Sequence, residues 1–106
     1  MLDLKWSEAE KKIARRAFDA AFQKECAAVI ERLLALAVNA KRPEDIWATH
    51  DYLTDQRRKI NEKYDYRYSQ LVVLFGKLLR EKWIENIDIE GLSDEKLQII
   101  HHIASL

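Results

Sequence analysis

The side chains of this 106-residue chain that could do chemistry are few: three histidines, one cysteine and scattered carboxylates. His101 and His102 are adjacent, so on a helix they point about 100° apart and cannot hold one metal ion as a pair spaced by three or four residues could. Cys26 lies in an alanine-rich stretch without a nearby His or Cys, which is typical of a small buried hydrophobe. These residues predict neither a metal site nor a nucleophile.

One group of residues indicates a functional surface more specifically: Trp47, His50, Asp51 and Arg57. Sequence physics alone favours an amphipathic helix with an anchoring Trp, a satisfied His and solvated charges. A protein interface is the second interpretation, because Trp and Arg most often dominate binding energy. A small enzyme or metal protein that uses His50 and Asp51 is the third, and it needs a pocket and a nucleophile that no motif indicates.

These residues lie on a predicted helix that begins at Pro43, where the missing N–H group of proline costs nothing. Ile46, Leu53 and Ile60 repeat every seven residues along it, and His50 falls on the same stripe. Polar groups therefore share a surface with an apolar seam.

A longer helix is predicted before it. Ser7 and Glu10 have the spacing of a capping box, and apolar residues recur at three- and four-residue steps from Ile13 to Leu36. No helix breaker occurs before residues 39–43, which gives a helix of about 30 residues against a mean of about 11 to 12. We expect such a helix to project beyond a small core unless another chain covers it.

The C-terminal part is predicted to be helical as well. Residues 64–69 contain neither Gly nor Pro, so the second helix either bends there or pauses and resumes over 71–82. Within that stretch, residues 71–75 with Leu78 and Leu79 are apolar nearly all round. Residues 84–91 are expected to form an irregular connector, and Ser93 to cap a short last helix. Three apolar residues of that helix should face the body: Leu97, Ile100 and Ile103.

Composition bounds the fold class. With 48% apolar residues, 34% charged residues, two glycines and one proline, the sequence favours an all-α fold in one domain spanning 1–106. Eighteen basic and eighteen acidic side chains cancel, which disfavours nucleic-acid binding. No uninterrupted apolar stretch is longer than six residues (33–38), far short of the roughly 20 that span a bilayer, so we expect no membrane insertion and a cytoplasmic location.

The order of residues resembles a known family. The stretch Trp47-Ala48-Thr49-His50-Asp51-Tyr52-Leu53, then Arg57, then residues 60–69 (INEKYDYRYS), is similar to the central motif of the fluorescence recovery proteins. The resemblance implies long antiparallel helices with a small helical head, forming a homodimer. It further implies a non-enzymatic regulator that binds photoactivated orange carotenoid protein and speeds its return to the resting form. This return ends quenching at the phycobilisome, and the regulator itself binds no cofactor.

The same resemblance assigns the candidate residues. In the family, the Trp, His, Asp and Arg of the motif form a patch at or beside the dimer interface. The expected patch, with its apolar seam, consists of Ile46, Trp47, His50, Asp51, Leu53, Arg57 and Ile60. Because the charged members are costly to desolvate unless all are paired, dissociation into monomers during the working cycle is a further expectation. In a cyanobacterium, the protein could also lie at the cytoplasmic face of the thylakoids.

Four more candidates belong to the predicted head. Phe75 and Lys96 occupy positions where family members carry similar residues, whereas Val73 and Ile99 replace an aromatic and a basic residue that serve partner binding. Lys82 stands where a glycine usually follows the third helix. These departures leave a second interpretation open, in which the same dimeric scaffold binds a different bacterial signalling or stress protein.

Overall fold

Local sequence signals begin the two long helices of the computed structural model, which describes residues 4–106. At the start of α1 (Glu8–Asn39), the backbone N–H of Glu10 donates to Ser7 Oγ (3.1 Å) and that of Ser7 donates to Glu10 Oε1 (3.0 Å), so the predicted capping box is confirmed. Helix α2 (Pro43–Lys63) begins at the predicted proline. In its first turn, Asp45 accepts hydrogen bonds from the backbone N–H groups of Lys41 and Arg42, which lower the pKa of this carboxyl.

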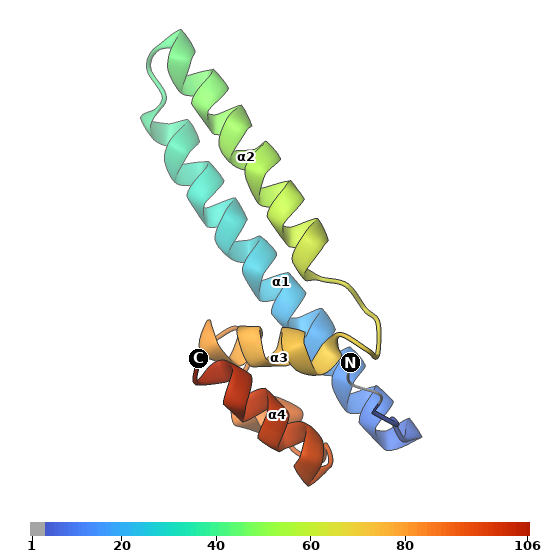
Figure 1. Cartoon of the computed structure of the whole chain (residues 1–106). Helices are drawn as coiled ribbons and strands as arrows, with labels where there is room; N and C mark the ends of the chain where they lie inside the picture. Colours follow the sequence, from blue (N-terminus) through green and yellow to red (C-terminus); the bar gives the residue numbers. More distant parts are fainter. Residues whose placement is uncertain (1–3) are drawn as a thin grey trace.

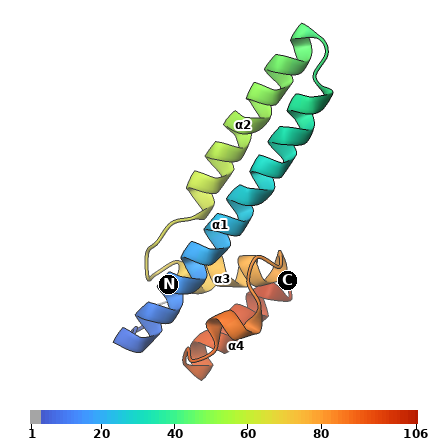
Figure 2. The ribbon, with the colours of Figure 1, turned by 180° about the vertical axis from the view of Figure 1, so that it is seen from behind.

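The two long helices form an antiparallel hairpin, and the rest of the chain folds into a small head beside the N-terminal half of α1 (Figures 1 and 2). The head contains α3 (Leu71–Arg80), the 3-10 helix η1 (Asn86–Ile89) and α4 (Asp94–Ala104). The molecule measures 53 × 26 × 26 Å. Residues 4–106 contain no strand, which confirms the all-α prediction, and none of their helices is long and apolar enough to cross a membrane.

The second and third helices are separate, which settles a question that the sequence left open. Tyr64 and Tyr66 follow α2 in non-helical conformations, and their rings pack edge-on against Phe18 of α1 with centroid distances of 5.4 and 4.9 Å. Phe22 packs against Tyr64 in the same way (5.3 Å). These contacts with α1 stabilise the non-helical conformation of the segment after α2, although no Gly or Pro enforces the break.

The core lies mainly in the head. Helix α3 contributes six buried residues and packs closely against α4, which Ser93 caps as predicted. Gly76 allows this approach, because a Cβ atom there would lie 2.5 Å from Ile103 Cγ2. Ile100 is fully buried, whereas Leu97 and Ile103 are half-buried. The connector predicted to be irregular contains η1, whose Ile89 is also fully buried.

Lys82 ends α3 in the left-handed region, with φ = +67°. The N–H of Trp83 donates to the carbonyl of Leu78 (2.9 Å), and that of Lys82 donates to the carbonyl of Leu79 (3.1 Å). This pair of bonds is the Schellman arrangement, in which glycine is favoured at the position that Lys82 occupies. The geometry agrees with the family resemblance, which places a glycine there.

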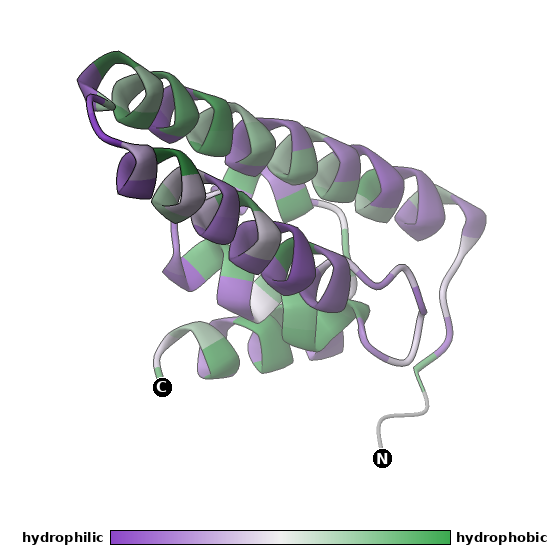
Figure 3. Ribbon diagram, turned by 90° about the horizontal axis from the view of Figure 1, so that it is seen from above, coloured by the Kyte–Doolittle hydropathy of each residue, from purple (hydrophilic) through white to green (hydrophobic). Residues whose placement is uncertain are grey.

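The hairpin, in contrast, has little core of its own. The buried residues of α1 end at Ala21, and Ile60 is the one buried residue of α2. Figure 3 shows apolar residues along both helices of the hairpin as well as in the head. Two long helices that bury so little against each other are marginal in water, because most helix stability comes from packing of an apolar face.

A candidate protein-binding site on the hairpin

The seam predicted along α2 exists, and its burial falls with distance from the head. Ile60 is 9% exposed, Leu53 is half-buried and Ile46 is 57% exposed. The three residues therefore lie on one stripe but in three environments. Residues 4–106 leave the end of the stripe near the turn between α1 and α2 uncovered.

The polar members of the patch are exposed as well. Trp47 is 64% exposed and belongs to no core formed by the described residues, contrary to the interpretation of an anchoring Trp that sequence physics favoured. His50 Nδ1 lies 3.7 Å from Asp51 Oδ1, and both side chains are exposed, so this pair contributes little stability. Within residues 4–106, no carboxylate forms an ion pair with Arg57, and no three His, Cys, Asp or Glu side chains are placed to hold a metal ion.

A groove of about 380 Å³ runs beside the seam, between α1 and α2. Leu53, Arg57 and Ile60 lie on its α2 side. The full lining is Phe22, Cys26, Val29, Leu53, Gln56, Arg57, Ile60 and Asn61. Burial, together with the negative charge of Glu25, raises the pKa of the Cys26 thiol, which disfavours the nucleophilic thiolate. The groove is thus an apolar recess with a polar rim.

Sequence reasoning missed the α1 side of this surface. Ile30, Leu34 and Val38 are exposed large apolar residues on α1. Their spacing of four residues, which places them on one helix face, was the signal available in the sequence. Together with Ile46 and Trp47, they give the hairpin an apolar surface that extends over both helices.

The four head candidates do not form one surface, and two of them need correction as contact residues. Phe75 is fully buried in the core and Lys96 is 3% exposed, so neither side chain is available to a partner in this conformation. Val73 and Ile99 are half-buried hydrophobic residues packed against the same core. Of the four, only these two present part of their side chains to solvent.

Lys96 is a structural cation inside the fold. Its Nζ lies 3.1 and 3.2 Å from the two carboxylate oxygens of Glu10 and donates to the carbonyl of Lys5 (2.5 Å). It also lies 4.8 Å from the ring centroid of Trp6. The ammonium is therefore fully engaged in joining α4 to the start of α1.

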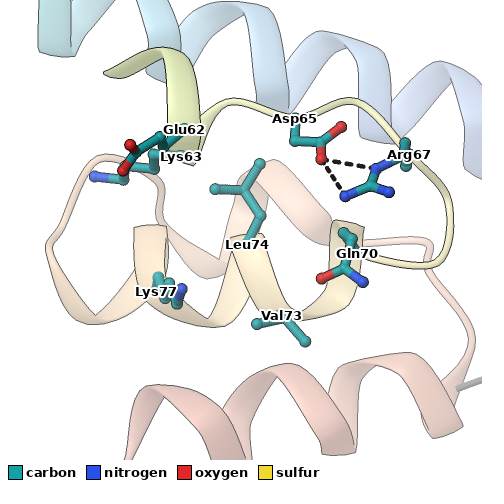
Figure 4. A pocket seen from close by; sticks show the side chains of 8 residues that line it. All are labelled: Glu62, Lys63, Asp65, Arg67, Gln70, Val73, Leu74 and Lys77. Atoms are coloured by element: carbon teal, nitrogen blue, oxygen red, sulfur yellow. Dashed lines mark hydrogen bonds and ion pairs between the residues drawn. The ribbon is translucent and has the colours of Figure 1, made fainter. Parts of the chain in front are cut away.

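A small charged pocket of about 160 Å³ marks the junction of hairpin and head (Figure 4). Val73 and Lys77 from α3 line it, with Asp65 and Arg67 from the segment between α2 and α3. Arg67 Nε donates to Asp65 Oδ2 at 2.7 Å. Val73 thus lies at the edge of a polar recess.

An ion-pair cluster holds the same junction from the hairpin side. Lys63 Nζ donates to Glu25 Oε1 (2.8 Å) and also to Glu81 at the end of α3. The hydroxyl of Tyr64 donates to Glu25 Oε1 at 2.7 Å, and burial together with this carboxylate raises the pKa of the phenol. Three helices are therefore joined at one point.

Over residues 6–104, the sequence matches the family described as photoprotection regulator fluorescence recovery protein. The chain belongs to this family. It is 32% identical to the fluorescence recovery protein of Synechocystis sp. over 101 residues, which cover 95% of this chain and 93% of that relative.

Solved structures of fluorescence recovery proteins have the same fold. The protein from Fremyella diplosiphon matches with a TM-score of 0.90 at 35% identity, covering 96% of this chain and 100% of that one. The Synechocystis sp. PCC 6803 protein matches with a TM-score of 0.91 at 31% identity and the same coverage. The resemblance seen in the central motif is confirmed, and the chain is a member of a family of photoprotection regulators.

Proposed function

We propose that the chain works as a homodimer in which two hairpins cover each other's apolar faces. The proposal is supported by Ile46 and Trp47, which this chain leaves exposed, and by the apolar residues that face solvent along α1. Two antiparallel hairpins packed together make a four-helix arrangement, the usual way to bury such faces. The head then remains free at each end of the dimer.

The polar residues of the patch affect the stability of this dimer. His50, Asp51 and Arg57 share the helix surface with the apolar seam, and desolvating them is costly unless each finds a partner. We therefore expect an interface in which these groups pair across the two subunits, and which can open when they exchange partners. Dissociation during the working cycle stays a prediction.

We infer that the dimer binds photoactivated orange carotenoid protein and accelerates its return to the resting form. Membership in a family of photoprotection regulators supports this inference, as does the complete central motif with Trp47 and Arg57 exposed. A binder can shift or speed a conformational change only through unequal affinity for the states involved. The protein thus binds the open conformer, and the transition state for its closure, more tightly than the closed form. This mechanism needs no covalent chemistry and no cofactor. The cytoplasmic location also stays a prediction.

Recovery kinetics test this inference. The purified protein is mixed with photoactivated orange carotenoid protein, and the red-to-orange change is followed in the dark. We expect faster recovery, and loss of the acceleration in Trp47→Ala and Arg57→Ala. Leu106→Ala and Arg16→Ala are matched controls, because they remove an exposed apolar and an exposed basic side chain elsewhere. Acceleration that survives both patch substitutions would contradict the assigned patch.

A second candidate function keeps the scaffold and changes the partner. It is favoured by Val73 and Ile99, half-buried aliphatic residues where the family carries an aromatic and a basic residue for partner binding. In that case the folded protein leaves the recovery rate of orange carotenoid protein unchanged. Restoring the family residue types at both positions would then restore acceleration, whereas under the first function it changes the rate little.

A further inference from the structure

The head carries an apolar pocket on the side formed by η1 and α4, away from the hairpin patch. It has a volume of about 270 Å³ and is lined by Asn86, Ile87, Glu90, Leu97 and His101. Ile87 is 67% exposed, so its side chain is open to a partner. The proposed function uses none of these residues.

The walls of the pocket are fixed in place. Ile89 is fully buried and anchors η1, while the backbone N–H of Glu85 donates to Asp88 Oδ2 at 2.8 Å. His101 Nε2 lies 2.8 Å from Asn86 Oδ1 and ties α4 to η1. A rigid recess loses little conformational entropy when it binds, which favours recognition.

The segment that supplies three of the five lining residues of the pocket is acidic. Residues 84–95 contain five carboxylates and no basic residue, and the next cation, Lys96, is buried against Glu10. Glu90 lines the pocket, and Asp94 lies one helical turn before Leu97 on the same face of α4. Among the described residues, none of these five carboxylates forms an ion pair.

We propose that this pocket is a second docking surface, which receives a basic amphipathic segment of a protein partner. An aliphatic side chain of that segment packs against Ile87 and Leu97, while flanking Lys or Arg side chains meet Glu90 and Asp94. Charge complementarity selects this occupant over an acidic or purely apolar one. The inference is independent of the proposed dimer face and of the identity of its partner.

Residue-resolved titration of the full-length protein tests the proposal. The probe is a helical peptide of about 12 residues with Leu at i, i+3 and i+4 spacing and Lys elsewhere, and the control peptide carries Glu in place of Lys. We expect NMR shift changes centred on Ile87, Glu90 and Leu97 with the basic peptide alone. Changes centred on Trp47 and Arg57, no binding, or equal binding of the acidic peptide would overturn the proposal.

Substitutions in the pocket, compared with control substitutions elsewhere, test the proposal further. Ile87→Ser and Glu90→Lys should each weaken binding about tenfold, since each removes a central contact. Leu106→Ser and Glu44→Lys change exposed residues of the same types elsewhere and should alter binding less than about twofold. Equal binding by wild type and Ile87→Ser would contradict the proposal. Assemblies larger than a dimer that disappear in Ile87→Ser would show that the pocket takes a second copy instead.

Discussion

Lys96 and Glu10 form a buried ion pair, with Nζ 3.1 Å from Oε2, between residues 86 positions apart. Glu10 also accepts from the backbone N–H groups of Ser7 (3.0 Å) and Ser93 (2.9 Å). One carboxylate thus caps the first helix and fixes the beginning of the last one. The pair fixes the start of α4 against the start of α1, and so contributes to the position of the head relative to the hairpin patch.

Lys96→Met should destabilise the fold by about 3 kcal/mol, because it leaves the Glu10 carboxylate buried without its countercharge. Lys77→Met is the matched control in the head, where the lysine is exposed, and should change stability by less than about 0.5 kcal/mol. Urea unfolding followed by circular dichroism at one protein concentration measures both. Equal midpoints for the two variants would contradict the structural role of Lys96.

The stability that Glu10 provides should depend on pH. Burial opposes ionisation of this carboxyl, but hydrogen bonds from Ser7, Ser93 and Lys96 outweigh it and lower the pKa. A depressed pKa means that the stabilisation is present above the unfolded value of about 4.3 and is lost as pH falls through the folded value. Glu10→Gln should therefore be less stable than wild type at pH 7, and the difference should shrink in acid.

Urea unfolding at several pH values between neutrality and about pH 3 measures this difference across the relevant range. Glu62→Gln, at an exposed position, is the control and should show no such convergence. A difference between Glu10→Gln and wild type that stays constant with pH would refute the account.

Lys82→Gly should stabilise the protein by about 1 kcal/mol, because the left-handed conformation costs a residue with a Cβ atom about that much free energy. Arg80→Gly, two positions earlier at the end of the right-handed helix, also removes an exposed basic side chain and should lose about 0.5 to 1 kcal/mol instead. Thermal unfolding of the two variants side by side separates backbone strain from loss of a charge. A lower melting temperature for Lys82→Gly than for wild type would contradict this interpretation.

Helix boundaries that depend on local signals could be predicted from the sequence, and those that depend on distant contacts could not. Ser7 and Pro43 mark helix starts through their own backbone chemistry, so both were predicted correctly. The break after Lys63 depends on aromatic packing of Tyr64 and Tyr66 against Phe18, which is 46 residues before Tyr64 in the chain. No pattern near the break contains that information.

The site was predictable to a similar extent. The period of seven placed Ile46, Leu53 and Ile60 on one stripe, as the structure confirms. Their different burial depends on how far the hairpin extends beyond the head, which the period does not contain. Lys96 could not be recognised as buried, because its partner Glu10 lies at the other end of the sequence. A lysine in a charged stretch is ordinarily a surface residue.

The claim on which the binding patch depends is that a second copy covers the exposed face of the hairpin. Sedimentation at micromolar concentration measures this directly through the mass of the wild type and of Ile46→Glu. A charge at this exposed apolar position should leave the monomer folded but exclude it from a dimer interface. Ile87→Glu makes the same change on the head and should remain dimeric. A wild-type dimer and an Ile46→Glu monomer would support the account, whereas a dimeric Ile46→Glu variant would contradict the assigned interface.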